Sequence, residues 1–374
     1  MKRSLVLVAA ILLAFTAGQA RGRSAAADKP RAQPRVEVAF VLDTTGSMSG
    51  LIRAAKEKIW FIANQIVLGK PRPIVRMALV PYRDKGDAYV TKVYDLTDNI
   101  DQVYTDLMGF KAVGGGDGPE NVNQALHDAV NKLNWSAGRE TLKIIYLVGD
   151  WPPHNEYKDV PTYDKIAGSA IEKGIYVNTI LCGNNAAARK VWVEIAERAE
   201  GTFAAIAQGG GVRTVATPFD KDPAKLNAEL TTTAVFYGDK KAQARYARLN
   251  AAAAKYAPTA SADRAVFAGE SGIAAAGDLV DAVRNKKVDL REISKEHLPA
   301  NMRKMSSKDR AKYIQTRQAK RDEITKKIKA LSAKRAAYVK KELVKAPAGK
   351  KGFDHKVVEA IHEQAARKGI TYEK

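Results

Sequence analysis

Apolar and polar positions between residues 36 and 206 follow two different periods, which predicts strands interleaved with helices. The first apolar run, residues 36–42, is rich in valine and ends in a polar turn. Behind the turn, apolar side chains recur with the period of an amphipathic helix until Gly69 and Pro71 end it. These side chains are Ile52, Ala55, Ile59, Ile62, Ala63 and Ile66.

The same alternation continues after residue 74. Residues 74–81 and 89–95 form a predicted hairpin, and residues 142–149 are almost continuously apolar, as in a strand buried on both faces. Further helices are predicted at residues 100–108, 122–133, 163–173 and 189–200, and further strands at 175–181 and 202–206. The alternation indicates a doubly wound α/β fold, in which helices cover both faces of a mostly parallel sheet. Ligands of such sheets bind at the carboxyl ends of the strands.

Polar side chains stand at two of these strand ends. Asp43, Thr45 and Ser47 alternate in the turn after the first strand, so their three oxygens can converge on one point. Asp150 directly follows the apolar strand at residues 142–149. The simplest alternative is that Asp43 and Ser47 only cap the following helix.

An acidic loop lies between these two strand ends in the sequence. Asp117 and Glu120 follow a triple glycine at residues 114–116, and Pro119 with Glu120 suits a helix N-terminus. Carboxylates and hydroxyls without His or Cys form an all-oxygen donor set, which Mg²⁺, Ca²⁺ or Mn²⁺ selects. The three motifs together favour a metal site over helix capping.

This constellation resembles the von Willebrand factor type A (VWA) domain, a Rossmann-like fold, and its metal-ion-dependent adhesion site (MIDAS). In that family a DxSxS turn supplies three metal ligands, and an Asp after the fourth strand supplies another. Asp43, Thr45, Ser47 and Asp150 match these positions, and Thr45 keeps the hydroxyl of the usual serine. The resemblance covers residues 36–215, about half the chain.

The middle loop departs from the common family pattern, because it contains no threonine. It resembles instead the Asp-x-Pro-Glu segment of integrin β subunits, whose glutamate takes the metal position. The resemblance therefore implies Glu120 as a ligand of the main metal. Asp117 then either contacts the ligands without touching the metal, or is itself a ligand of an adjacent cation.

The resemblance also implies a function, which is cation-dependent binding of a protein partner. An acidic side chain of the partner would fill the open coordination position of the metal, with Mg²⁺ expected first and Ca²⁺ or Mn²⁺ as alternatives. Arg83 and Lys85 are candidates for offsetting the acidic charge of the site, although a solvated surface pair is their more ordinary interpretation. His154 follows Asp150 by four residues and either lines the cleft or packs within its loop.

An enzyme is the alternative from a different class. A metal-dependent hydrolase acting on a phosphate ester or an acidic envelope component would need a second cation, for which only Asp117 is available. The sequence contains no P-loop lysine motif, no dinucleotide fingerprint and no His-Glu-x-x-His pair. We therefore expect a binding protein rather than an enzyme.

The N-terminus has the pattern of a secretory signal peptide. Lys2 and Arg3 precede an apolar run at residues 5–17, and small residues follow it. We expect residues 1–20 to be a signal peptide, residues 21–35 to be a flexible basic linker, and the mature protein to be soluble and periplasmic or secreted, without a transmembrane helix. An uncleaved membrane anchor is the alternative. The single cysteine, Cys182, permits no intramolecular disulfide and is expected to be a packed thiol.

Charge divides the chain into three parts. The net charge of +21 separates into +6 on residues 1–35, zero on residues 36–280 and +15 on residues 281–374. A neutral body excludes a protein that coats nucleic acid over its whole length. Residues 216–280 are expected to be a packing segment and linker, and residues 281–374 a basic, all-helical C-terminal extension.

The predicted elements of this second half are mostly helices. A helix and a strand are expected at residues 223–237, and helices at 240–256, 263–291 with breaks, 302–344 and 353–368. Three interpretations compete for the basic region. It is a solvated stalk that packs on its own domain, or it attaches to an anionic envelope surface. The third, nucleic-acid binding, is disfavoured by the export signal.

Overall fold

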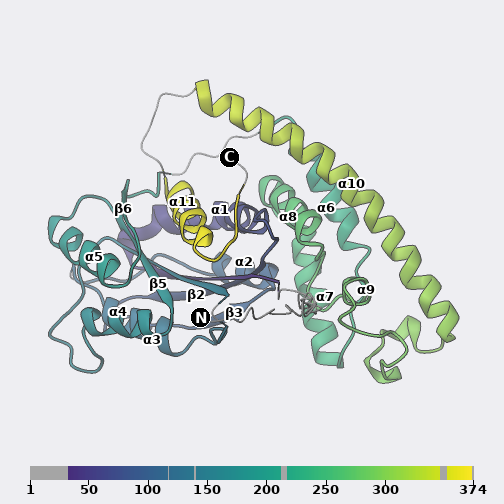
Figure 1. Ribbon diagram of the computed structural model, residues 1–374, viewed down its shortest axis with the longest axis horizontal. Helices are drawn as coiled ribbons and strands as arrows, with labels where there is room; N and C mark the ends of the chain where they lie inside the picture. Colours follow the sequence, from purple (N-terminus) through teal and green to yellow (C-terminus); the bar gives the residue numbers. More distant parts are fainter. Residues whose placement is uncertain (1–32, 117, 139, 212–216, 346–351, 373–374) are drawn as a thin grey trace, which may run out of the picture. The chain divides into compact units, whose positions relative to one another are not determined.

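The computed structural model describes residues 33–116, 118–138, 140–211, 217–345 and 352–372 (Figure 1). Its centre is a six-stranded sheet with the order β3-β2-β1-β4-β5-β6. Neighbouring strands are parallel except for β2 and β3, which are antiparallel. The strands are β1 (Arg35–Asp43), β2 (Ile74–Tyr82), β3 (Tyr94–Thr97), β4 (Thr141–Gly149), β5 (Ile175–Cys182) and β6 (Phe203–Ile206). The predicted α/β fold class is confirmed.

Helices cover both faces of the sheet. One face carries α1 (Ser49–Val67), α2 (Ile100–Met108) and α11 (Phe353–Ala366), and the other carries α3 (Val122–Asn131), α4 (Tyr163–Glu172) and α5 (Ala186–Arg198). Figure 1 shows α1 and α11 on one side of the strands and α3 and α4 on the other. Alternate side chains of β1 serve the two layers, because Phe40 joins the first core and Val41 joins the second.

The last helix of the chain, α11, belongs to the core of the sheet domain. The ring of Phe353 packs against Phe40 with 6.1 Å between ring centroids. The Tyr146 hydroxyl donates a hydrogen bond of 2.8 Å to the carbonyl oxygen of Val357. The basic C-terminal region therefore ends in a helix that completes one face of the sheet.

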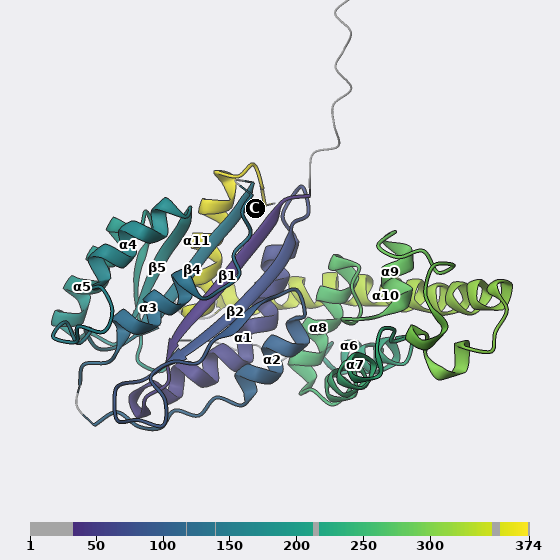
Figure 2. The same ribbon diagram turned by 90° about the horizontal axis from the view of Figure 1, so that it is seen from below.

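The helices between β6 and α11 form an extension next to α2 (Figure 2). They are α6 (Lys221–Thr231), α7 (Lys240–Ala253), α8 (Pro258–Ser271), α9 (Leu279–Arg284) and α10 (Ser307–Lys345). Between α9 and α10 lie two single-turn 3₁₀ helices, η2 (Lys295–His297) and η3 (Ala300–Met302), and a similar turn in the sheet domain, η1 (Gly46–Met48), follows β1. The predicted all-helical extension is confirmed, and its small apolar cores are supplemented by ion pairs.

One buried ion pair joins this extension to the sheet domain. The guanidinium of Arg264 on α8 donates two hydrogen bonds of 2.7 Å to the carboxylate of Asp101 on α2. The remaining guanidinium donors reach the side chain of Asn227 and the carbonyl oxygen of Ala274, each at 2.8 Å. Four of the five N–H donors of this buried guanidinium thus have acceptors, as a buried charge requires hydrogen-bond partners.

Two predictions at the level of single elements are wrong. No strand follows α6 as far as residue 237; Phe236 makes only an isolated bridge with Asp278. In the hairpin, β3 begins at Tyr94 rather than at residue 89. Tyr89 is used differently, because its hydroxyl is hydrogen-bonded at 2.7 Å to Thr44 in the turn after β1.

Other expectations are confirmed or lie outside the described residues. Cys182 is buried, as predicted for a packed thiol. Among the helices that the structure describes, none is long and apolar enough to cross a membrane. The proposed signal peptide at residues 1–20 and most of the linker at residues 21–35 lie outside the described residues.

Candidate functional site

Adjacent parallel strands bring Asp43 and Asp150 to the same edge of the sheet. Leu42 on β1 is in register with Val148 on β4, so the two strands end side by side. Asp43 is the last residue of β1, and Asp150 directly follows β4. Their exposed fractions are only 1% and 5%, so both carboxylates are buried.

The turn after β1 is organised by Asp43. Its Oδ1 accepts hydrogen bonds from the backbone N of Thr45 at 2.8 Å and from the Thr45 hydroxyl at 2.6 Å. Ser47 lies exposed in η1. Neither η1 nor α1 begins with a side-chain cap, so the helix-capping alternative does not account for Asp43 and Ser47.

The glycine-rich loop lies directly on this turn. The backbone N of Gly46 donates a hydrogen bond of 3.0 Å to the carbonyl oxygen of Gly114. Gly115 has a φ of +82°, and a Cβ there would lie 3.2 Å from Cβ of Thr45 and 3.4 Å from Oε1 of Glu120. The absence of a side chain at Gly115 therefore lets Glu120 and Thr45 approach each other.

Glu120 is fixed by its backbone to the loop after β4. Its N–H donates to the carbonyl oxygen of Pro152 at 3.2 Å, and its own carbonyl oxygen accepts from the N–H of His154 at 3.1 Å. The side chain is 2% exposed. The structure thus brings Asp43, Thr45 and Glu120 close together, whereas Asp117 lies outside the described residues.

The electrostatics of this cluster favour bound protons or a bound cation. Burial raises the pKa of Asp43 to about 7, the charge of Asp150 adds to this, and hydrogen bonds from Thr45 act in the opposite direction. Burial also raises the pKa of Glu120 to about 9, with the charges of Asp43 and Asp84 as further causes. Ionised carboxylates are costly here unless a positive charge accompanies them.

Two carboxylate oxygens of the cluster are buried without a donor. Within the described residues, no hydrogen bond reaches Oε2 of Glu120 or Oδ1 of Asp150. Native proteins rarely leave buried polar atoms in this condition without an ion, a water or a functional reason. The residues present therefore fit a cation that carboxylates and hydroxyls can hold.

Carboxylates alone do not complete a metal cage. In the part of the chain that is described, no group of three or more His, Cys, Asp or Glu side chains is arranged to hold a metal ion. A site built from the described residues would therefore be a mixed one, in which the hydroxyls of Thr45 and Ser47 supplement the carboxylates.

Two further carboxylates near the cluster were not among the predicted residues. Asp84 follows β2, and its Oδ2 accepts a hydrogen bond of 2.9 Å from the Tyr157 hydroxyl. Asp87 Oδ2 accepts from the backbone N of Gly115 at 3.2 Å. The carboxyl-end rule that singled out Asp150 applies equally to Asp84, so this residue could have been found from the sequence.

Gln208, just after β6, was also missed. Its Nε2 donates a hydrogen bond of 2.7 Å to Oδ2 of Asp150 and lies 3.4 Å from the carbonyl oxygen of Ser47. An amide after a short strand carries no pattern that distinguishes it from other loop residues, so the sequence offered no signal.

The neighbouring basic side chains differ from each other. Arg83 is buried, and its guanidinium donates to the carbonyl oxygen of Lys111 at 2.9 Å, so the expectation of a solvated side chain is wrong for this residue. Lys85 is exposed and pairs with Asp159. His154 is buried and stacks on Tyr157 at 4.6 Å between ring centroids, which agrees with packing within its loop.

The strand order and the two helical layers define a doubly wound α/β domain, and the oxygen-rich cluster lies at the carboxyl ends of its strands. Residues 37–218 match the family model described as von Willebrand factor A domain. The chain therefore contains a von Willebrand factor A domain over this span.

Two known proteins each resemble a part of the chain. The human von Willebrand factor A domain-containing protein 7 is 38% identical over 97 residues, which are 26% of this chain and 10% of that protein. An ariadne-like RING finger protein of Acanthamoeba polyphaga mimivirus is 31% identical over 124 residues, 33% of this chain and 12% of that protein. The chain thus spans about a tenth of the length of these curated relatives.

A solved structure that resembles part of the chain is that of proximal thread matrix protein 1 from the mussel byssus, with a zinc occupied MIDAS motif. It is 14% identical in sequence, with a TM-score of 0.38, and the match covers 47% of this chain and 42% of that chain.

Proposed function

We propose that Asp43, Thr45, Ser47, Glu120 and Asp150 hold a divalent cation, and that the domain binds a protein partner through it. The observation that carries this proposal is the pair of buried carboxylate oxygens, on Glu120 and Asp150, that no described group satisfies. Mg²⁺ is the first candidate, with Ca²⁺ or Mn²⁺ as alternatives, because all the donors are oxygens. When bound, the cation offers an open coordination position to a carboxylate of the partner.

The side chains of the cluster have distinct parts in this proposal. Asp43 orients the hydroxyl of Thr45 through its two hydrogen bonds. Gln208 holds one oxygen of Asp150 and leaves the other oxygen toward the site. Glu120 is the proposed direct ligand of the cation. Asp117 either contacts the ligands without touching this cation, or binds an adjacent one.

Exposed apolar side chains beside the cluster support a protein partner. Trp151, next to Asp150, is 41% exposed, and Val113 in the glycine-rich loop is 55% exposed. A Cβ at Gly118 would lie 2.4 Å from the indole ring of Trp151, so the ring lies directly on the backbone of that loop. Aromatic anchors of this kind are frequent in protein interfaces.

We further propose that the protein acts outside the cytoplasm and that α10 attaches it to an anionic envelope surface. One side of α10 packs through Ile324 and Ile328 on α6 and α8. The other sides carry exposed lysines, which supports an electrostatic role. These are Lys308, Lys312, Lys320, Lys326, Lys327, Lys329 and Lys334. Salt-sensitive binding of the full chain to anionic vesicles, and N-terminal sequencing of the protein from cell fractions, test the two parts.

A pull-down from envelope extract tests partner binding through the cation. We expect EDTA and Asp43→Ala each to abolish capture, and Trp151→Ala to weaken it without changing the affinity for Mg²⁺. Capture that survives both EDTA and Asp43→Ala would contradict the proposal. Hydrolysis of a phosphate ester that Asp43→Ala abolishes would favour the metal-dependent hydrolase instead.

A further inference from the structure

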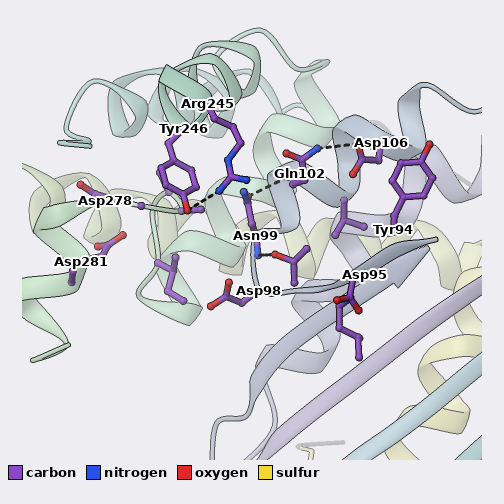
Figure 3. Close-up of a pocket in the computed structure, with 18 of the residues that line it drawn as sticks. Tyr94, Asp95, Asp98, Asn99, Gln102, Asp106, Arg245, Tyr246, Asp278 and Asp281 are labelled. Carbon is purple, nitrogen blue, oxygen red and sulfur yellow. Dashed lines mark hydrogen bonds between the residues drawn. The ribbon is translucent and has the colours of Figure 1, made fainter. Parts of the chain in front are cut away.

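A cavity of about 590 Å³ lies between one edge of the sheet and the helical extension (Figure 3). One wall is formed by β3 and the first turns of α2, and the opposite wall by α7 and by residues 273–287. None of the proposed metal ligands lines it. Its volume falls within the range of about 300 to 1,000 Å³ that is usual for small-molecule sites.

The lining of this cavity is acidic although the chain is strongly basic. Five aspartates face one arginine and one lysine. Two of the aspartates, Asp278 and Asp281, share the single buried guanidinium of Arg321, with a distance of 2.5 Å to each. Even when Arg321 is counted, the formal charge of the lining is −2, whereas the whole chain carries +21. Such a local field concentrates cations.

Two of these carboxylates are available to a ligand. Asp98 is exposed, and the described residues provide no hydrogen bond or ion pair to its carboxylate. Asp106 accepts one hydrogen bond, of 2.9 Å from Nε2 of Gln102 to its Oδ1, and its other oxygen is left for a ligand. Asp95 differs, because both of its oxygens accept hydrogen bonds from Asn134.

Aromatic rings complete the two ends of the cavity. Figure 3 shows Tyr94 beside Asp106 at one end, and Tyr246 beside Arg245 on the opposite wall. The Arg245 guanidinium lies 4.8 Å from the centroid of the Tyr246 ring. A tyrosine face attracts an organic cation in the same way. The end formed by Tyr94 and Asp106 therefore offers a ligand cation both negative charge and an aromatic surface, and Asp98 adds negative charge near the start of α2.

The ring of Tyr246 packs directly on the backbone of Gly277. Gly277 has a φ of +66°, and a Cβ there would lie 2.1 Å from the Tyr246 ring. The ring also stacks on Phe236 with 6.4 Å between centroids. The α7 wall is therefore a packed surface of the fold.

We propose that this cavity binds an organic cation, namely a primary ammonium or guanidinium group carried on a short apolar stem. The charged group binds the carboxylate of Asp106, the stem lies against Tyr94, and Asp98 contributes negative charge from the other end of α2. The same chemistry is supplied by a free aliphatic amine and by a lysine or arginine side chain of a peptide. The experiment distinguishes these sources.

Isothermal titration of the full chain at low salt with three probes tests the proposal. Cadaverine represents the free amine, Nα-acetyl-lysine amide represents a peptide side chain, and Nα-acetyl-norleucine amide is its uncharged counterpart. Asp98→Asn and Asp106→Asn each remove one negative charge with little change of shape. Asp222→Asn is the matched control, because Asp222 is an exposed aspartate on α6 that does not line the cavity.

We expect at least one of the two ammonium probes to bind and the norleucine probe not to bind. Asp106→Asn should weaken binding by about tenfold, the usual effect of losing a charge-assisted hydrogen bond. Asp98→Asn should weaken binding to a smaller extent, because it only reduces the local negative charge, and Asp222→Asn should leave binding unchanged. Binding of cadaverine alone identifies a free amine, and binding of the lysine amide alone identifies a peptide side chain. The proposal is overturned if neither ammonium probe binds, if norleucine amide binds equally well, or if the two cavity variants bind like Asp222→Asn.

Discussion

The side-chain amide of Gln208 donates a hydrogen bond of 2.7 Å to Oδ2 of Asp150, the carboxylate whose other oxygen is buried without a donor. The two residues come from the ends of different strands, β6 and β4. This hydrogen bond fixes the orientation of a proposed metal ligand. Residues that hydrogen-bond to a metal ligand commonly affect the affinity for the metal as strongly as some ligands do.

Removal of this amide tests its role. We expect Gln208→Ala to weaken Mg²⁺ binding by about tenfold without a large loss of stability. Gln315→Ala changes the same residue type at an exposed position of α10 and should leave Mg²⁺ binding unchanged. Titration calorimetry of both variants measures the difference. Equal affinities for the two would show that Gln208 does not position Asp150.

The raised pKa values of the buried carboxyls predict that the stability of the metal-free protein falls as pH rises. The pKa values of about 7 for Asp43 and about 9 for Glu120 lie above the values of about 3.9 and 4.3 that these carboxyls have in unfolded chains. Between the unfolded and folded values the native state binds more protons, so its stability falls as pH rises. The stabilisation that these protonated carboxyls contribute is fully present at pH values below about 3.9, the lower of the two unfolded-state pKa values. It is lost above about pH 9, where Glu120 is ionised in the folded state as well.

Thermal melts with EDTA and with Mg²⁺ measure this effect. We expect Tm in EDTA to fall between about pH 5 and pH 9, and the fall to be smaller in Glu120→Gln, which cannot ionise. Saturating Mg²⁺ should reduce the fall, because its affinity rises as the carboxyls lose their protons. A Tm in EDTA that is constant or rises over this interval would contradict the electrostatic account.

The glycine-rich loop offers a pair of matched substitutions. Gly115→Ala places a side chain on a residue with positive φ and against Thr45 and Glu120. We expect it to cost about 1 to 2 kcal/mol of stability from the backbone and to weaken Mg²⁺ binding. Gly116→Ala is the control, since nothing lies within 4 Å of its added Cβ. Urea unfolding and calorimetry should leave the Gly116 variant close to the wild type, and equal behaviour of the two variants would argue against the close approach.

The ion pair between α8 and α2 should be important for stability. Arg264→Ala leaves the carboxylate of Asp101 buried without its charged partner, and we expect a loss of about 3 to 5 kcal/mol in the free energy of unfolding. Arg291→Ala breaks an exposed pair with Asp289 and should leave the free energy of unfolding nearly unchanged. Urea denaturation compares the two variants. Similar small losses in both would mean that the extension is held to the sheet domain by other contacts.

Much of the fold follows from local patterns in the sequence. The strands and helices could be predicted because each element buries one face or both, which gives its apolar residues a regular period. The position of Asp150 directly after a buried strand predicted that it lies at the same edge of the sheet as Asp43. The role of α11 could not be predicted in this way. Its apolar stripe, which includes Val357 and Ile361, would suit packing against any surface, and its contact with β1 joins residues more than 300 positions apart.

The interior of the candidate site was less predictable than its location. The burial of Arg83 depends on Tyr89 and Lys111, which lie in two different loops, and no period in the sequence describes either loop. Likewise, the cavity beside α2 is lined by residues far apart in the chain, such as Asp98 and Tyr246. Such relationships depend on tertiary packing, which local patterns do not encode.

Cation binding by the carboxylate cluster is the central claim, and a calorimetric titration of the metal-free protein with Mg²⁺ tests it most directly. We predict saturable binding of a cation by the wild type and by Asp222→Asn, and affinity at least about tenfold weaker in Asp43→Asn, which keeps the shape of the side chain but not its charge. Absence of binding by the wild type, or equal affinity in Asp43→Asn, would contradict the account.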